Sequence, residues 1–209
     1  KSVGEAMSIG RNFKESLQKG LVSLEIGYKG LDSLNKLSDK ELKKKLSQNL
    51  PDKLIIVAEA LRRKVSIKNI YRYTNIDPWF LEQIYELVDE EKKLKKYGMP
   101  KTFKELSHIK SMGFSDDKIA ELTKTTENEV KKQRKQLGVL PIFKKIDTCA
   151  AEFKSETPYM YSTYQRLAEE LSACEANPTN KEKIIILGGG PNRIGQGIEF
   201  DYCCCQASF

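Results

Sequence analysis

The sequence of 209 residues is poor in the side chains on which catalytic triads and zinc sites depend, with one histidine and five cysteines. A Ser-His-Asp triad could be built only around His108, and its neighbours Leu106 and Ile109 place it on an ordinary helix. The cysteines form no CxxC pair, and the adjacent Cys203, Cys204 and Cys205 cannot all reach one tetrahedral metal. We therefore expect no catalytic residue and no metal site in this chain.

Long apolar runs and targeting signals are also absent. The longest apolar run, residues 184–187, is far shorter than the ~20 residues that a membrane helix needs. Residues 1–5 hold neither an initiator methionine nor an apolar signal region, so we expect the chain to be a fragment of a longer protein. An odd number of cysteines without a disulfide pattern fits a reducing compartment. The sequence therefore predicts a cytoplasmic protein without a membrane partner.

Acidic residues are fewer than basic ones, 29 against 36, which gives a net charge of +7. The excess lies in three stretches, at residues 36–45, 90–104 and 124–145. Such stretches could attract a nucleic acid or an anionic surface. Acidic residues interrupt each of them, so we interpret them as solvated helix faces and expect no specific nucleic-acid partner.

From residue 12 to about residue 138, apolar residues recur at helical spacing between clear start and stop signals. Capping residues predict helix starts at Asn12, Ser38, Ser66, Asp77, Thr102, Ser115 and Thr126. A further helix is expected over residues 54–61, where the apolar spacing continues. Every connection is short, so the sequence predicts an all-helical domain over residues 12–140.

Two helix pairs inside this domain, residues 66–85 and 115–135, each consist of a short helix, a turn and a second helix. Helix-turn-helix proteins that bind DNA have this shape. However, the second helix opens with Glu82 in one pair and with Glu127 in the other, where a base-reading helix carries basic or amide side chains. A helix-turn-helix-like DNA-binding protein is therefore one alternative, and an ordinary packing unit is the interpretation that we favour.

After Pro141 the helical spacing is lost, and residues 183–187 have the composition of a buried strand that leads into a glycine-rich turn. Glycines at such a turn let a backbone approach a phosphate. However, Gln196 occupies the lysine position of a P-loop, and Arg193 stands where a dinucleotide fingerprint needs glycine. A free-standing nucleotide-binding domain is therefore the second alternative, and a structural turn is favoured.

Several motifs along the chain are distinctive enough to compare with known families. They are KSVGEAMSIG at residues 1–10, DTCAAEF at 147–153, YMYST at 159–163 and GGGPNRIGQGIEFDYCC at 188–204. In this order they resemble the tail of the first half, the linking segment and the opening of the second half of the large subunit of carbamoyl phosphate synthetases. The resemblance covers essentially the whole chain, and the glycine- and cysteine-containing motifs are its most specific part.

The resemblance implies a mainly α fold, in which an all-helical connection domain is followed by the first strand, turn and helix of an α/β pre-ATP-grasp domain. Residues 1–11 would be the tail of the first ATP-grasp half, which forms carboxyphosphate. Residues 12–140 would be the helical oligomerisation or connection domain. Residues 141–209 would be the truncated start of the second half, which forms carbamoyl phosphate.

The same resemblance implies the function of the parent protein. The family's ligase makes carbamoyl phosphate from bicarbonate, ammonia or glutamine, and two ATP, for arginine and pyrimidine biosynthesis. ATP with Mg or Mn would bind the full-length protein, and the fragment is expected to be structural, inactive and without a cofactor. The implied partners are a glutaminase small subunit and further copies, bound through the helical domain. By their positions in the motif, Gly197 and Glu199 resemble residues that line the family's interior tunnel.

Overall fold

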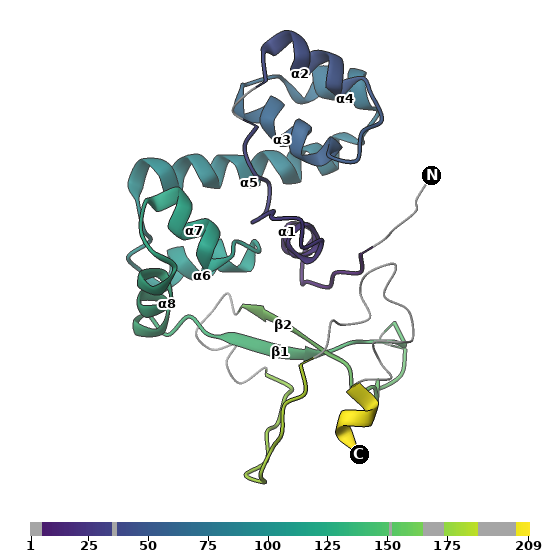
Figure 1. The fold of residues 1–209 in the computed structure, drawn as a ribbon, viewed down its shortest axis with the longest axis vertical. Helices are drawn as coiled ribbons and strands as arrows, with labels where there is room; N and C mark the ends of the chain where they lie inside the picture. The colour runs from purple at the N-terminus through teal and green to yellow at the C-terminus, as the bar shows by residue number, and fades with distance from the viewer. Residues whose placement is uncertain (1–5, 35–36, 151, 165–173, 188–203) are drawn as a thin grey trace.

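The computed structural model describes residues 6–34, 37–150, 152–164, 174–187 and 204–209. Figure 1 shows two groups of helices at the two ends of the long helix α5, with a two-stranded sheet below them. Helices α2, α3 and α4 form one group, and helices α6, α7 and α8 form the other. Helix α1 lies between α5 and the sheet (Figure 1). The predicted mainly α fold is confirmed.

The first four helices are α1 (Phe13–Ser23), α2 (Asp39–Leu46), α3 (Lys53–Arg62) and α4 (Ile67–Thr74). The side chains of Asn12, Ser38 and Ser66 accept hydrogen bonds from backbone N–H groups of the first turn, as predicted. Helix α3 differs, because Asp52 makes no such bond. Every residue from 55 to 61 is buried instead, so packing rather than capping stabilises α3.

The next four helices are α5 (Pro78–Tyr97), α6 (Phe103–Ser111), α7 (Asp116–Thr123) and α8 (Glu127–Gln136). Asp77 caps α5 ahead of a proline at its first position, and Ser115 caps α7. Thr102 and Thr126 form reciprocal capping boxes with the glutamates three residues further on. All four predicted starts are confirmed, and with them the two helix pairs α4–α5 and α7–α8.

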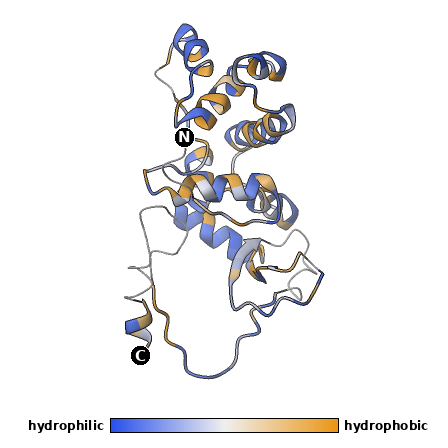
Figure 2. Ribbon diagram, turned by 90° about the vertical axis from the view of Figure 1, so that its right-hand side faces the viewer, coloured by the Kyte–Doolittle hydropathy of each residue, from blue (hydrophilic) through white to orange (hydrophobic). Residues whose placement is uncertain are grey.

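One apolar core runs through both groups of helices. Fully buried side chains include Leu46 of α2, Ile56 of α3, Ile70 of α4, Ile84 of α5, Leu106 of α6 and Ile119 of α7. Burying each such side chain stabilises the fold by about 1.5–3 kcal/mol. Figure 2 shows hydrophobic and hydrophilic colours side by side on most helices, as amphipathic helices require. The lysines of the 90–104 stretch are exposed, which confirms its interpretation as a solvated face.

A β-hairpin follows the helices and was not predicted from the sequence. Strand β1 (Pro141–Lys145) pairs in antiparallel fashion with strand β2 (Met160–Tyr164). Ile142 lies opposite Thr163 in the register, and both side chains are buried. The hairpin therefore presents one face to the helical domain, and it adds a layer where the sequence predicted only a loss of helical spacing.

The strand predicted over residues 183–187 is wrong. These residues have no strand partner in the described part of the chain, and Ile184 and Leu187 are 90% and 92% exposed. An apolar run becomes a buried strand only when a neighbouring strand pairs with it and a layer covers it. The glycine loop predicted to follow lies outside the described residues, whereas residues 204–208 are helical. Among the described helices, none is long and apolar enough to cross a membrane.

Candidate functional site

The residues that the sequence singled out for function do not form a site in the described structure. Gly197 and Glu199, the predicted tunnel residues, lie outside the described residues. His108 lies on the exposed side of α6, with its Nε2 3.9 Å from a carboxylate oxygen of Glu90. Among the residues that the structure describes, no three His, Cys, Asp or Glu side chains gather as a metal site would require. The structure instead draws attention to a buried polar junction.

Glu15 of α1 is the centre of this junction, with its side chain 1% exposed. Its Oε2 accepts hydrogen bonds from the backbone N–H of Arg11 at 2.8 Å and from the hydroxyl of Thr163 at 3.0 Å. Its Oε1 lies 2.8 Å from the ammonium group of Lys19. One carboxylate therefore joins the segment that leads into the helical domain to the strand that follows the domain, although Glu15 and Thr163 are 148 positions apart in the sequence.

Asn12 caps α1 as predicted, but the reciprocal half of a capping box with Glu15 does not form. The Asn12 side chain accepts from the backbone N–H of Glu15 at 3.0 Å, as predicted. A reciprocal box would need the Glu15 carboxylate to accept from the backbone N–H of Asn12. It accepts instead from the backbone N–H of Arg11, one residue earlier, and from the hydroxyl of Thr163 on β2.

Helix α1 is seated on the C-terminal end of α6. The last carbonyls of a helix lack hydrogen-bond donors within the helix. Here the N-cap residue of α1 and one side chain of α1 donate to the last carbonyls of α6. Asn12 Nδ2 donates to the Ser111 carbonyl and Gln18 Nε2 donates to the Met112 carbonyl, each at 2.9 Å. Gly113 follows with a φ of +92°, and a Cβ there would lie 2.9 Å from the Cα of Glu15. Only glycine allows the two backbones to approach so closely.

A second buried cluster holds the end of β2 against α6, α7 and α8. The ammonium group of Lys110 donates to the Phe114 carbonyl at 2.6 Å and to Asp116 at 2.8 Å. The guanidinium of Arg134 donates to the other oxygen of Asp116 at 3.2 Å. Both cations face the ring of Tyr164, with the Lys110 nitrogen 4.6 Å and the Arg134 carbon 5.5 Å from its centroid. The hairpin is thus held by two cations that α6 and α8 provide.

The electrostatics of this cluster follow from burial and pairing. Burial lowers the pKa of Lys110 below its ordinary value, and the neighbouring Asp116 offsets part of that shift. Burial also opposes ionisation of Asp116, but the charges and hydrogen bonds of Lys110 and Arg134 outweigh it and hold the carboxyl pKa below its ordinary value. Burial raises the pKa of the Tyr164 phenol, which therefore stays neutral. The cluster is an ionic contact in which two cations share one carboxylate, and each of the three charges has a partner.

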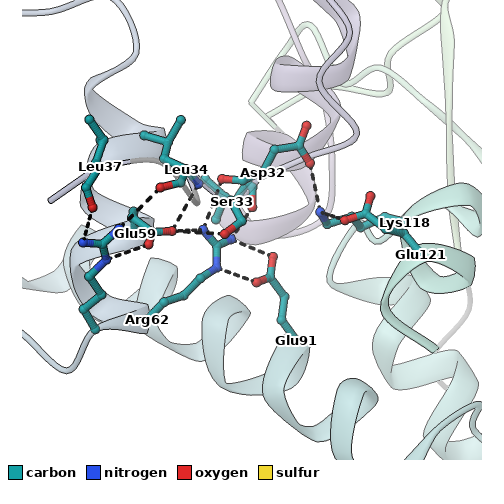
Figure 3. A network of polar contacts seen from close by, with 11 residues as sticks. Asp32, Ser33, Leu34, Leu37, Glu59, Arg62, Glu91, Lys118 and Glu121 are labelled. Carbon is teal, nitrogen blue, oxygen red and sulfur yellow. Dashed lines mark hydrogen bonds and ion pairs between the residues drawn. The ribbon is translucent and has the colours of Figure 1, made fainter. Parts of the chain in front are cut away.

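A third network, drawn in Figure 3, fixes residues 31–34 against α3, α5 and α7. Arg62 lies between two carboxylates, with its Nε 2.9 Å from Glu91 and its Nη1 3.5 Å from Glu59 (Figure 3). Lys118 of α7 reaches Asp32 at 2.9 Å. Charges that are this well buried stabilise a fold only when they are paired, as all of these are. The network therefore joins the two groups of helices into one body.

A cavity of about 300 Å³ lies beside the junction, between α1 and β2. Its polar lining includes Glu15, Lys19, Lys110, Ser115 and Thr163, whose side chains are already bound to each other or to the backbone. Sequence reasoning missed Glu15 and Thr163 as functional residues, because no spacing links positions so far apart. Their arrangement suits a structural role, in which Glu15 holds two distant segments of the chain together, rather than a catalytic one.

Comparison with known proteins identifies families that match two regions of the chain. A protein-family model described as "Carbamoyl-phosphate synthetase large chain, oligomerisation domain" matches residues 5–138, and one described as "Carbamoyl phosphate synthase preATP-grasp domain" matches residues 180–209. The hairpin lies between the two matched regions. The first match covers the helices described above, together with the segment that leads into α1.

Curated relatives match along the whole chain. The carbamoyl phosphate synthase large chains of Pseudomonas aeruginosa and of a Nostoc species are each 50% identical to it, and that of Brucella melitensis is 47% identical. In each case the match covers 100% of this chain but only 18–19% of the relative, so the chain spans less than a fifth of their length. The similarity along the full length of this chain and the two family matches agree, and the chain belongs to the carbamoyl phosphate synthetase large-chain family.

Proposed function

We propose that this chain is the connecting part of a carbamoyl phosphate synthetase large chain and has no catalytic activity by itself. The parent protein would be an ATP-dependent ligase that makes carbamoyl phosphate from bicarbonate, ammonia or glutamine, and ATP. The observation that carries the proposal is the identity of 47–50% to such large chains over the full length of the chain. Residues 1–11 would end the first synthetase half, and residues 141–209 would begin the second. Residues 12–140 would form the helical domain that connects the two halves.

The geometry of the junction supports a connecting role. A connector between two catalytic halves must hold the segment that arrives from one half and the segment that leaves toward the other. Glu15 binds both segments through Arg11 and Thr163, and the cluster around Lys110 holds the end of β2. A hydrogen bond to a buried charged group contributes about 1.5–3 kcal/mol, so these contacts can fix the relative position of the two segments.

The cofactors and partners are proposed for the parent protein. ATP with Mg or Mn would bind outside this fragment, because the glycine loop carries Gln196 where a P-loop has lysine. A glutaminase small subunit would supply ammonia, further copies would assemble through the helical domain, and the protein would work in the cytoplasm. The acidic first turn of α8, with Glu127 and Glu129, does not favour the helix-turn-helix alternative, since a reading helix needs basic or amide groups there. Helix α5 has no acidic residue in its first turn, because Glu82 lies beyond it, and that turn is apolar instead.

Gly197 and Glu199 are proposed to line the path between the two halves. Replacing Gly197 with leucine in the intact protein would add a side chain where the path is narrow. We expect bicarbonate-dependent ATP hydrolysis and ATP formation from carbamoyl phosphate to persist, while coupled synthesis falls. Loss of the second partial reaction would indicate local misfolding, and unimpaired coupled synthesis would remove Gly197 from the path.

The connecting role is tested by Thr163→Val in the intact protein, which removes one hydroxyl but keeps the shape of the side chain. We expect both partial reactions to survive and coupled carbamoyl phosphate synthesis to fall, because the Glu15 carboxylate loses its contact with β2. The control is Ser162→Ala, the neighbouring exposed position on the same strand. Equal activities of the two variants would contradict the role, and an intact protein that makes no carbamoyl phosphate would refute the function.

A further inference from the structure

An aromatic patch lies on the surface where α1 and α5 begin. It consists of Phe13, Trp79 and Phe80, whose ring centroids are 5.0–5.5 Å apart in all three pairs. Trp79 is 50% exposed and Phe80 is 41% exposed, although they contact each other and Phe13. Their place on α5 explains the exposure, because the buried stripe of that helix starts only at Leu81.

Such a patch indicates an interaction surface. Large exposed apolar clusters are uncommon on the surface of a protein without a partner. Tryptophan is among the residues that dominate binding energy at protein interfaces, where its ring is covered by the partner. The patch is also preorganised, because the rings already hold each other in edge-on and tilted arrangements, so docking needs little further ordering.

The charges around the patch point to a protein rather than a nucleic acid. Asp77 caps α5 two residues before the tryptophan, and Glu82 is exposed one turn further along. Glu86 follows on the same side of the helix and pairs with Lys14 of α1. An acidic rim repels phosphates, whereas it complements a protein surface with basic side chains around an apolar centre.

The position of Phe13 indicates which protein surface covers the aromatic patch. Phe13 is the first residue of α1, so residues 6–12 lead directly to the patch. An extended chain spans at most about 3.3–3.6 Å per residue. Whatever precedes this segment in the parent protein is therefore held close to the patch. A short tether raises the effective concentration of the attached surface to about the millimolar range, which a separate copy in solution does not reach.

We propose that the aromatic patch is the docking surface for the preceding synthetase half of the same polypeptide, whose contact region would be apolar with basic side chains at its rim. This inference rests on the proposed function, because it requires that half to precede residue 1. The hydrogen bonds of Glu15 would fix the path of the incoming segment, and the patch would fix the orientation of the half that the segment carries. A connector that only tethered its halves would not need the patch.

Hydroxyl-radical footprinting of the intact large chain tests the inference. Labelling rates of Trp79, Phe80 and Tyr97 are measured by mass spectrometry in native and in urea-unfolded protein, at high and at low protein concentration. If the patch were free, Trp79 would be labelled in the native protein at about half its unfolded rate, as its exposed fraction of 50% indicates. We expect a severalfold lower rate that does not change on dilution. Tyr97, which is 70% exposed on the same helix, serves as the reference.

Two results would overturn the inference. Labelling of Trp79 at the rate of a free surface would show that nothing docks there, and protection that disappears on dilution would assign the patch to a second copy. A variant pair gives an independent measurement, because Trp79→Ala should speed proteolytic cleavage within residues 1–11 and Tyr97→Ala should not. Equal cleavage rates in the two variants would also count against docking. If the protein makes carbamoyl phosphate but Trp79 is free, the docking inference fails while the proposed function stands.

Discussion

Replacing Gly113 with alanine tests whether α1 really rests on the turn after α6. The added Cβ would lie 2.9 Å from the Cα and 3.1 Å from the carbonyl oxygen of Glu15. Both atoms belong to the backbone, so no side-chain rotation can relieve the contact and α1 must shift. The residue also has a φ of +92°, which L-amino acids other than glycine rarely adopt.

The expected magnitude combines two effects. A non-glycine residue in the left-handed region costs about 1–2 kcal/mol, and forcing an extra methyl group into a packed site costs about 1–3 kcal/mol. The free energy of unfolding of Gly113→Ala should therefore fall by about 2–5 kcal/mol. Gly138→Ala separates the two effects, since Gly138 has a φ of +72° but no atom within 4 Å of its ideal Cβ. It should lose only the first, about 1–2 kcal/mol.

Urea unfolding of the chain, followed by circular dichroism, measures both variants against the parent sequence. The free energy lost by Gly113→Ala should exceed that lost by Gly138→Ala, and the difference reports the close approach of α1 to the turn. Amide hydrogen exchange at Gln18 should also speed up in the first variant only, because the shift of α1 loosens its contact with the end of α6. Equal losses in the two variants would mean that α1 does not lie against this turn.

Three further predictions concern the buried cluster and the C-terminal segment. Lys110→Met should destabilise the chain by about 3–5 kcal/mol, because Asp116 keeps its charge but loses its nearest partner. The control Lys104→Met, at an exposed position, should change the free energy of unfolding by about 0.5 kcal/mol or less. Similar losses for the two variants in urea unfolding would contradict this prediction. Because the folded-state pKa of Asp116 lies below its unfolded value of about 4, its contribution is present above that pH and is lost as the pH falls through the folded pKa. Urea unfolding at a series of pH values should therefore give a flatter decline in acid for Asp116→Asn than for the parent chain, and parallel curves would refute the assignment. In limited proteolysis with mass spectrometry, residues 180–187 should be cleaved before any residue of α3 or α5, since Ile184 and Leu187 are almost fully exposed, and the reverse order would count against the described exposure.

The helical domain was predictable because its signals are local. A capping residue such as Thr102 or Thr126 and the glutamate three residues later act within a single turn, so sequence neighbours decide the helix start. The apolar spacing that follows selects the buried face without reference to the rest of the chain. Even the uncapped helix α3 was predicted, because its spacing continues through a completely buried segment.

The errors arose where the outcome depends on distant residues. The run over residues 183–187 has the composition of a strand, but composition does not supply the partner that a strand needs. The hairpin was missed although its strands hold β-branched and aromatic residues, because each strand is only five residues long and the pair is ordered by packing Ile142 and Thr163 against the helices.

The sequence by itself determined the helices, their caps and, through its motifs, the family to which the chain belongs. Tertiary structure alone decided that the Glu15 carboxylate binds Thr163 of β2, and that Lys110 and Arg134 both face Tyr164. It also decided that Trp79 lies beside Phe13 on the surface. The physical reason is distance along the chain: a cap or an amphipathic stripe is completed within a few residues. A buried carboxylate or an exposed ring acquires its role only when folding brings a distant partner to it, or leaves it without cover.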